Sequence, residues 1–485
     1  MIDLAASTWV ESYLRDWRPG SGELADIHEP ATGQTLASIT QSTPDDVARA
    51  AAAASAAQPS WAETGYEDRA RVLRRVADLI ETHADEIALW NVRETGAVRG
   101  KADNEVYNTL NEVLNAATMP AQPYGSLVPS AQSARLSMAR RVPVGVIGAI
   151  TPWNFPLVLG MRIVAPALAL GNAVVLKPDP QTPVTGGAIF AALFAEAGLP
   201  DGVLQIVCGG GDVGEALVSD RSVSMVSFTG STRTGRRVAQ LAANSLKKTS
   251  LELGGNNAFI VLEDADIDLA SSAGAWGSFL HQGQICLTTG RHLVHQEVAS
   301  AYVEALAARA RQLTVGDPYR ANVHLGPLMN ERQLARVDDV VTRSVAGGAV
   351  LVEGGTHDGL FYRPTVLEKV STDQPAFTDE IFGPVAPVTT FASDQEAVAL
   401  ANLSEYGLVA GIHTRSISRG LAIANRLKSG MVHVNDQTVN DEAIVPFGGM
   451  GASGNGGRFG GAANFEEFTQ WQWVTVRDEP PSFPF

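Results

Sequence analysis

The chain has 485 residues, 45% of them hydrophobic, and a formal net charge of −16. That length is too great for one simple core, so we expect two or three domains. The acidic balance argues against a nucleic-acid partner, which would need lysine and arginine to neutralise phosphates.

Helical spacing of apolar residues fills the segment 44–120, where we expect two or three helices. From 142 to 260, short β-branched runs alternate with helical patterns, which predicts a parallel sheet with crossover helices. A second cycle from about 291 to 440 predicts a second α/β domain. The aromatic strand 471–478 follows both domains, and we expect it to pair with 136–144 and to serve subunit contact, because an unpaired strand edge seeks a partner.

No apolar run approaches the roughly 20 residues needed to cross a bilayer, so we expect no membrane segment. Residues 1–10 lack the basic start of a secretory leader, and two cysteines cannot form a disulfide scaffold. We therefore expect a cytoplasmic protein. The nine histidines show no metal-binding spacing, so no metal is expected.

Three polar residues stand at or just after the ends of predicted strands. In TPWNFP (151–156), the amide of Asn154 could donate to a developing oxyanion, although a turn asparagine gives the same pattern. In KPDPQTP (177–183), Lys177 lies at a strand's carboxyl end, where ligands of open α/β sheets bind, unless it is a solvated loop lysine. In LELGG, the apolar setting of Glu252 would raise its carboxyl pKa towards the range of a general base.

FTGSTRTG (228–235) connects a predicted strand to a helix. Gly230 allows close backbone approach, and Ser231 is placed as an N-cap that could hold a phosphate, although an ordinary capped helix fits equally well. Two matches to G-x-G-x-x-G, at 209–214 and 449–454, are interpreted as turns. The first has no acidic residue about 20 positions downstream, and the second follows a loop.

Cys286 lies in HQGQICLTTG (281–290), between glutamines and threonines. A structural thiol usually packs among aliphatic residues. This polar setting favours a thiol that is reached and deprotonated, which is the form that reacts as a nucleophile.

The order of these motifs resembles the aldehyde dehydrogenase family. TPWNFP, KP, FTGSTRTG, LELGG, GQIC, EIFGP and PFGG follow one another across nearly the whole chain. Within the family, the segments 177–187 and 433–456 are most similar to bacterial benzaldehyde and vanillin dehydrogenases.

The resemblance implies an α/β fold with three parts. A Rossmann-like NAD(P)-binding domain would comprise 1–120 and 145–252, and a second α/β catalytic domain would comprise 253–445. The segments 121–144 and 465–485 would supply strands for oligomerisation, as a homodimer or homotetramer.

By the same resemblance, the thiolate of Cys286 attacks the aldehyde carbon, and the amide of Asn154 with the Cys286 backbone holds the oxyanion. Hydride leaves to the nicotinamide, and Glu252 activates the water that hydrolyses the resulting thioester. The implied cofactor residues are Trp153, Lys177, Gly230, Ser231, Glu380 and Phe382. The implied substrate-pocket residues are Phe155, Arg162, Ile285, Leu287 and Phe447.

Two departures from the family pattern affect these expectations. Pro180 stands where many NAD-specific members have a ribose-binding glutamate, so we expect NAD as the main cofactor with NADP also accepted. Ile163 replaces a lysine that is common in the family, which removes any proton relay through that residue.

Three other functions compete with oxidation of an aromatic aldehyde. A CoA-acylating enzyme usually lacks the general base, so Glu252 favours hydrolysis. Succinate semialdehyde needs cations for its distal carboxylate, and only Arg162 is present because the second arginine position is Leu280. A non-catalytic relative would not be expected to retain Cys286, Glu252 and Asn154.

Overall fold

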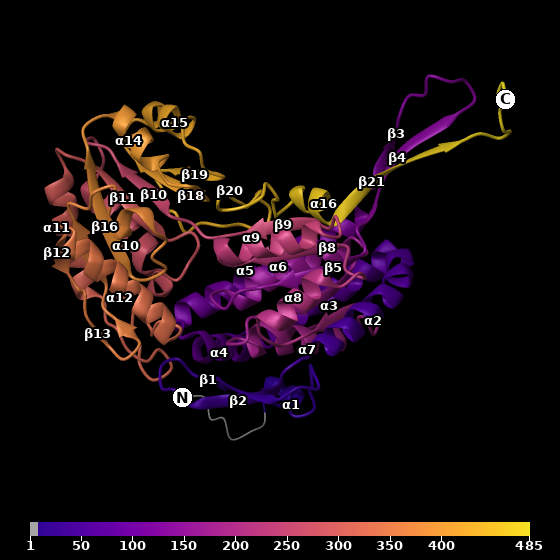
Figure 1. The fold of residues 1–485 in the computed structure, drawn as a ribbon, viewed down its shortest axis with the longest axis horizontal. Coiled ribbons are helices and arrows are strands. Elements are labelled where there is room, and N and C mark those ends of the chain that lie inside the picture. The colour runs from indigo at the N-terminus through magenta and orange to yellow at the C-terminus, as the bar shows by residue number, and fades with distance from the viewer. Residues whose placement is uncertain (1–7) are drawn as a thin grey trace.

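The computed structural model describes residues 8–485, so the prediction of a missing leader falls largely outside the described residues. Two α/β lobes lie side by side, and a narrow β arm projects from one of them (Figure 1). The shorter N-terminal elements are α1 (Trp9–Leu14), β1 (Leu24–His28) and β2 (Thr35–Thr40). Among residues 8–485, no helix has both the length and the apolar character needed to cross a membrane.

Four helices, rather than two or three, occupy the segment 44–120. They are α2 (Pro44–Glu63), α3 (Tyr66–Thr82), α4 (Ala84–Thr95) and α5 (Arg99–Thr118). The links between them are very short, so the apolar spacing continues across each link and does not reveal where one helix ends and the next begins. One break is set by Gly96, which ends α4 in the left-handed conformation with φ 70°.

The first lobe contains a parallel sheet of order β7–β6–β5–β8–β9. Its strands are β5 (Val146–Ile150), β6 (Ala173–Lys177), β7 (Leu204–Ile206), β8 (Met225–Thr229) and β9 (Lys248–Glu252). This confirms the predicted parallel sheet, with one difference. The run 257–261, which closes the first predicted cycle, pairs in the other sheet, and β9 takes the edge position instead.

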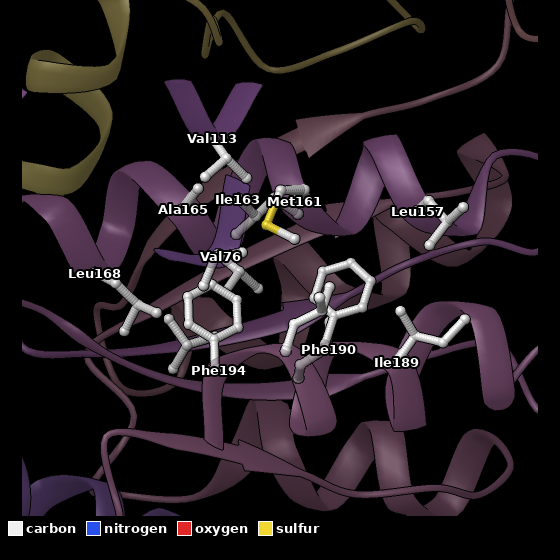
Figure 2. Packing of buried hydrophobic residues seen from close by; sticks show 14 of the residues in the cluster. Val76, Val113, Leu157, Met161, Ile163, Ala165, Leu168, Ile189, Phe190 and Phe194 are labelled. Atoms are coloured by element: carbon white, nitrogen blue, oxygen red, sulfur yellow. The ribbon is translucent and has the colours of Figure 1, made fainter. Parts of the chain in front are cut away.

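Helix α6 (Pro156–Ala169) forms the centre of the first lobe and is buried along its whole length, because every residue except Arg162 is apolar. Figure 2 shows Met161 and Ile163 of α6 among side chains of α5 and of α7 (Ile189–Glu196). Gly160 allows the close approach of α7, because a Cβ there would lie 2.7 Å from the ring of Phe190. The remaining helices of this lobe are α8 (Gly211–Ser219) and α9 (Thr232–Ala243).

The second lobe contains a seven-stranded sheet, which confirms the predicted second α/β unit. In spatial order the strands are β12 (Val350–Glu353), β15 (Thr365–Glu368), β16 (Val385–Phe391), β11 (Thr289–His295), β10 (Asn257–Val261), β18 (Val409–His413) and β19 (Met431–Val434). All neighbours are parallel except β12 and β15. The surrounding helices are α10 (Ile267–Phe279), α11 (Ala299–Gln312), α12 (Glu331–Ala346), α14 (Asp394–Ala401) and α15 (Ile417–Ala424).

The projecting arm is the predicted pairing of the C-terminal strand. β21 (Thr469–Val476) runs antiparallel to β4 (Leu136–Pro143), and β3 (Gly125–Leu127) pairs on the other side of β4. The strand begins two residues earlier than predicted, directly after α16 (Ala463–Phe468). The side chains of Trp471 and Trp473 are 55% and 67% exposed, so the arm displays aromatic surface.

Candidate active site

A cleft of about 480 Å³ lies where the carboxyl ends of β5, β6, β8 and β9 face the second lobe. Residues from distant parts of the sequence line this one cleft. Those predicted from the sequence are Trp153, Asn154, Lys177, Gly230, Ser231, Cys286, Glu380 and Phe382. The position agrees with the general rule that open α/β sheets bind ligands beyond the carboxyl ends of their strands.

At one end of the cleft, Lys177 is the last residue of β6 and is buried, so it is not a solvated loop lysine. Its ammonium donates to the backbone oxygen of Pro178 at 3.2 Å, and burial lowers its pKa. Ser231 caps α9, with its Oγ accepting from the backbone N–H of Thr234 at 3.4 Å. The amino end of α9 therefore presents free N–H groups to the cleft, a geometry that suits a phosphate.

The first glycine motif is not an ordinary turn, so that interpretation was wrong. Gly211 begins α8, and Gly210, Gly211 and Gly214 line the cleft, with Gly214 next to the side chain of Lys177. The motif was rejected because no acidic residue follows it at the sequence spacing of the usual dinucleotide-binding motif. The second motif contains the two-residue strand β20 (Met450–Gly451) followed by a turn.

At the other end of the cleft, Glu380 accepts a hydrogen bond from the N–H of Gly255 at 2.9 Å. A Cβ at Gly254 would lie 2.4 Å from the Glu380 carboxylate, so this approach requires glycine. The rings of Trp153 and Phe382 meet edge to face with centroids 5.6 Å apart. Together these residues build a flat-walled site with a carboxylate at its edge.

Three basic residues in the cleft were not predicted. Arg332 and Arg336 reach it from α12, and Arg237 reaches it from α9. Arg336 also donates to the backbone oxygen of Glu380. These arginines lie on ordinary amphipathic helices, so no sequence motif marks them.

Cys286 lies between the buried side chains of Ile285 and Leu287, and its own side chain is partly exposed to the cleft. The side chain of Asn257 donates to the Cys286 backbone oxygen at 2.7 Å and fixes this turn. Burial, followed by the charges of Glu252 and Glu380, raises the pKa of the thiol to about 12. The thiol is reachable as expected, but its surroundings do not favour the thiolate, so its proton needs an acceptor.

Asn154 follows β5 and is buried against the turn that carries Cys286. Its Nδ2 donates to the backbone oxygen of Gln284 at 2.9 Å, which leaves the second amide hydrogen for another acceptor. Its backbone oxygen accepts from the ammonium of Lys101 at 2.8 Å. Lys101 and its partner Glu105 were not predicted, because they lie on α5, far away in the sequence.

Glu252 is the last residue of β9 and is buried, as expected. Neither carboxylate oxygen has a hydrogen-bond partner among the described residues, and burial raises the pKa well above its usual value. Glu252 and Cys286 line a small cavity of about 10 Å³ together with Phe447. That volume is at the lower limit for one water molecule. A base, space for a water and a thiol therefore adjoin one another.

The predicted substrate-pocket residues form one apolar cluster beside Cys286. Ile285, Leu287 and Phe447 pack with Leu408 and Val409. Phe155, Leu280 and Val439 pack against that cluster. An apolar group next to the thiol therefore finds a wall of aliphatic and aromatic surface.

Arg162 lies at this site, but its charge is already paired. Its Nε donates to Glu112 at 2.9 Å, its Nη2 pairs with Asp441, and its guanidinium lies 4.6 Å from the ring centre of Phe447. The sequence identified Arg162 as a candidate cation, whereas the fold supplies two carboxylates that neutralise it.

The buried histidines differ in their surroundings. The ring of His281 packs edge to face against Phe155, and neither of its nitrogens has a hydrogen-bond partner among the described residues. His292 lies between the hydroxyls of Ser278 and Tyr302, each at 2.7 Å. Within residues 8–485, no group of three or more histidine, cysteine, aspartate or glutamate side chains is arranged to hold a metal ion.

The thiol, the carboxamide and the buried carboxyl meet at the junction of the two α/β lobes, and such a set of groups can attack a carbonyl carbon, stabilise an oxyanion and activate a water. The chain belongs to the aldehyde dehydrogenase family, whose sequence profile matches residues 17–474. It is 51% identical to a benzaldehyde dehydrogenase (NAD+) of Pseudomonas putida, over 98% of this chain and 97% of that protein. It is 53% identical to a vanillin dehydrogenase of an Amycolatopsis species, with 98% and 97% covered. A betaine aldehyde dehydrogenase of Staphylococcus aureus, solved in complex with NAD+, superposes with a TM-score of 0.94 at 30% identity, covering 98% of this chain and 99% of that one.

Proposed function

We propose that the protein oxidises an aromatic aldehyde of the benzaldehyde, hydroxybenzaldehyde or vanillin type to its carboxylic acid, with NAD+ as the main oxidant. The observation that carries the proposal is the adjacency of Cys286, Glu252 and a water-sized cavity to an apolar wall that contains Phe447. The names of the two similar dehydrogenases support the aromatic class.

In this proposal the sulfur of Cys286 forms a bond to the aldehyde carbon. The free amide hydrogen of Asn154 and the backbone N–H of Cys286 stabilise the resulting oxyanion. Because the thiol pKa is about 12, the sulfur must lose its proton as it attacks, and solvent in the cleft, to which the thiol is exposed, takes that proton. After oxidation leaves a thioester on Cys286, Glu252 deprotonates the attacking water, and the acid and the free thiol are released.

The cofactor residues fit a dinucleotide. Lys177 and the amino end of α9 at Ser231 supply positive groups for a ribose and a pyrophosphate, and Glu380 supplies an acceptor for ribose hydroxyls. Trp153 and Phe382 provide the walls for a nicotinamide. When bound, the cofactor accepts the hydride. Pro180 lines the cleft beside Lys177, which supports acceptance of NADP+ as well.

An aldehyde with a distal carboxylate fits this site poorly. Arg162 is already paired with two carboxylates, and Leu280 offers no charge. An aromatic ring instead gains about 25 cal/mol for each Å² of apolar surface removed from water. A desolvated, unpaired carboxylate would lose free energy in the same place.

A substrate screen tests the proposal. Reduction of NAD+ at 340 nm is measured with benzaldehyde, vanillin, 4-hydroxybenzaldehyde and succinate semialdehyde. We expect the preferred aromatic aldehyde to exceed the semialdehyde in kcat/KM by at least about a hundredfold, equivalent to ~2.7 kcal/mol in the transition state. Cys286→Ala should oxidise none of them while still binding NAD+. An equal or higher value for the semialdehyde would refute the aromatic assignment.

We also propose how the chain divides into domains, how it assembles and where it is located. The parallel sheet of the first lobe, with residues 1–120 and 145–252, is the cofactor domain, and 253–445 is the catalytic domain. The segments 121–144 and 465–485 mediate assembly into a homodimer or homotetramer, supported by the exposed tryptophans of the arm. A cytoplasmic location is supported by the reactive thiol, because reducing compartments keep such thiols free.

A further inference from the structure

Three charged residues meet in the interior between α5, α6 and the segment 435–446. The guanidinium of Arg162 contacts the carboxylates of Glu112 and Asp441 on one side and the ring of Phe447 on another. Arg162 and Glu112 are almost completely buried, and the side chain of Asp441 is 23% exposed. Two carboxylates against one guanidinium give this acidic cage a formal charge of −1.

The acidic cage adjoins the reacting groups. Arg162 and Phe447 line the same small cavity as Cys286 and Glu252. Burial by itself would lower the pKa of Arg162, but the charges of Asp441 and Glu112 outweigh burial and raise it. The arginine therefore stays protonated, and its positive charge is compensated within the protein.

We propose that Glu112 and Asp441 determine substrate selectivity by neutralising Arg162, so that the site rejects aldehydes that carry a carboxylate and accepts uncharged aromatic ones. The proposal rests on the proposed function and defines its substrate class more closely. Without its two partners, Arg162 would offer a buried cation to an incoming carboxylate. With them, an incoming carboxylate meets a local excess of negative charge in a site of low dielectric, where repulsion is strong.

The acidic cage also has a geometric consequence. The two carboxylates hold the planar guanidinium against the face of Phe447, at 4.6 Å from the ring centre. Asp441 belongs to the segment that carries Val439, which packs on the apolar cluster beside Cys286. The same contacts that compensate the charge of Arg162 thus also support the apolar wall.

A pair of substrates that differ only in charge tests the proposal. Benzaldehyde and 4-carboxybenzaldehyde share the ring and the aldehyde, and the second adds one carboxylate. For the native enzyme we expect kcat/KM to favour benzaldehyde by about a hundredfold. In Asp441→Asn, and in Glu112→Gln where it folds, this ratio should fall at least tenfold. The fall in this ratio should not occur in the double variant Arg162→Met/Asp441→Asn, because faster oxidation of 4-carboxybenzaldehyde requires the exposed cation of Arg162.

Asp436→Asn is the matched control. Asp436 is an exposed carboxylate of the same segment whose partners are Gln437 and Asn440, and its loss should leave the ratio unchanged. An unchanged ratio in a folded Asp441→Asn enzyme that still oxidises benzaldehyde would overturn the proposal.

Product binding separates this proposal from the proposed function. Dissociation constants of benzoate and terephthalate are measured by titration with each variant, without turnover. Asp441→Asn should tighten terephthalate relative to benzoate at least tenfold, and no relative change would overturn the role of the acidic cage. A native enzyme that binds both acids but oxidises no aromatic aldehyde would refute the proposed function alone.

Discussion

The ammonium of Lys101 donates a 2.8 Å hydrogen bond to the backbone oxygen of Asn154, although the two residues lie 53 positions apart. Lys101 also pairs with Glu105, whose other carboxylate oxygen accepts from the backbone N–H of Leu157 at 2.9 Å. This buried pair joins α5 to the first turn of α6. It thereby holds the asparagine whose amide is proposed to stabilise the oxyanion.

We therefore predict that Lys101→Met lowers kcat by about tenfold to a hundredfold with little change in NAD+ affinity, because small misplacements of a stabilising donor are costly. The variant also leaves the buried carboxylate of Glu105 without a cation, with only the hydrogen bonds from Asn91 and from the backbone of Leu157 and Val158 remaining, at a cost of about 3 kcal/mol in unfolding free energy. Lys101→Met/Glu105→Gln removes that charge and should recover much of the stability without recovering kcat. Full activity in a stable double variant would show that Lys101 acts only on folding.

For the base, we predict that Glu252→Gln gives a rapid burst of NADH followed by a steady state slower by roughly a hundredfold, because general-base catalysis contributes on this scale. Stopped-flow absorbance at 340 nm distinguishes the two phases. Control reactions in Glu466→Gln, a change at an exposed carboxylate on the arm side of the lobe, should resemble the native enzyme. A variant without a burst but with normal steady-state turnover would assign the base elsewhere.

The pH profile should follow the same carboxyl. Burial raises the pKa of Glu252 well above its usual value, and only the ionised form accepts a proton from water. Hydrolysis of the thioester should therefore rise with pH through an apparent pKa above the ordinary glutamate range, and decline as pH falls below it. Single-turnover deacylation rates across pH measure this limb. Its persistence in Glu252→Gln would contradict the assignment.

For the cofactor, we predict that Pro180→Glu penalises NADP+ at least tenfold more than NAD+ in kcat/KM. Position 180 lines the cleft next to Lys177, so a new carboxylate there would oppose a 2′-phosphate, and a tenfold change corresponds to ~1.4 kcal/mol. Pro180→Gln supplies a similar side chain without the charge and should change the ratio little. Equal losses with both cofactors would place the ribose elsewhere.

For the proposed assembly, we predict that Trp473→Glu lowers the molecular mass of the particle in solution, because it puts a charge on the exposed aromatic face of β21. Light scattering after size-exclusion chromatography measures the mass. Leu246→Glu puts the same charge on an exposed apolar side chain that follows α9, outside the arm, and should leave the mass unaltered. An unchanged mass for Trp473→Glu would exclude that face of the arm from the contact.

Sequence by itself established the two α/β units, the pairing of the C-terminal strand with 136–144, and the family. These features depend on local periodicity and on short motifs, and both are formed by residues that are neighbours in the sequence. It also identified Cys286, Glu252 and Lys177, because each differs in polarity from its neighbours in the sequence. Cys286 is a thiol among polar residues, Glu252 is a carboxyl among apolar residues, and Lys177 is a charged residue at the end of a buried strand.

Only the tertiary structure decided which charges meet. The residues near Arg162 in the sequence do not indicate that Glu112 and Asp441 will contact it. The residues near Asn154 likewise do not indicate the contact with Lys101. These contacts join elements that are far apart in the sequence. The pKa of Cys286 was misjudged for the same reason, since its polar neighbours along the chain do not reveal the burial and the acidic groups around the folded thiol. Electrostatic energies depend on distance and burial in three dimensions, and those quantities exist only once the chain has folded.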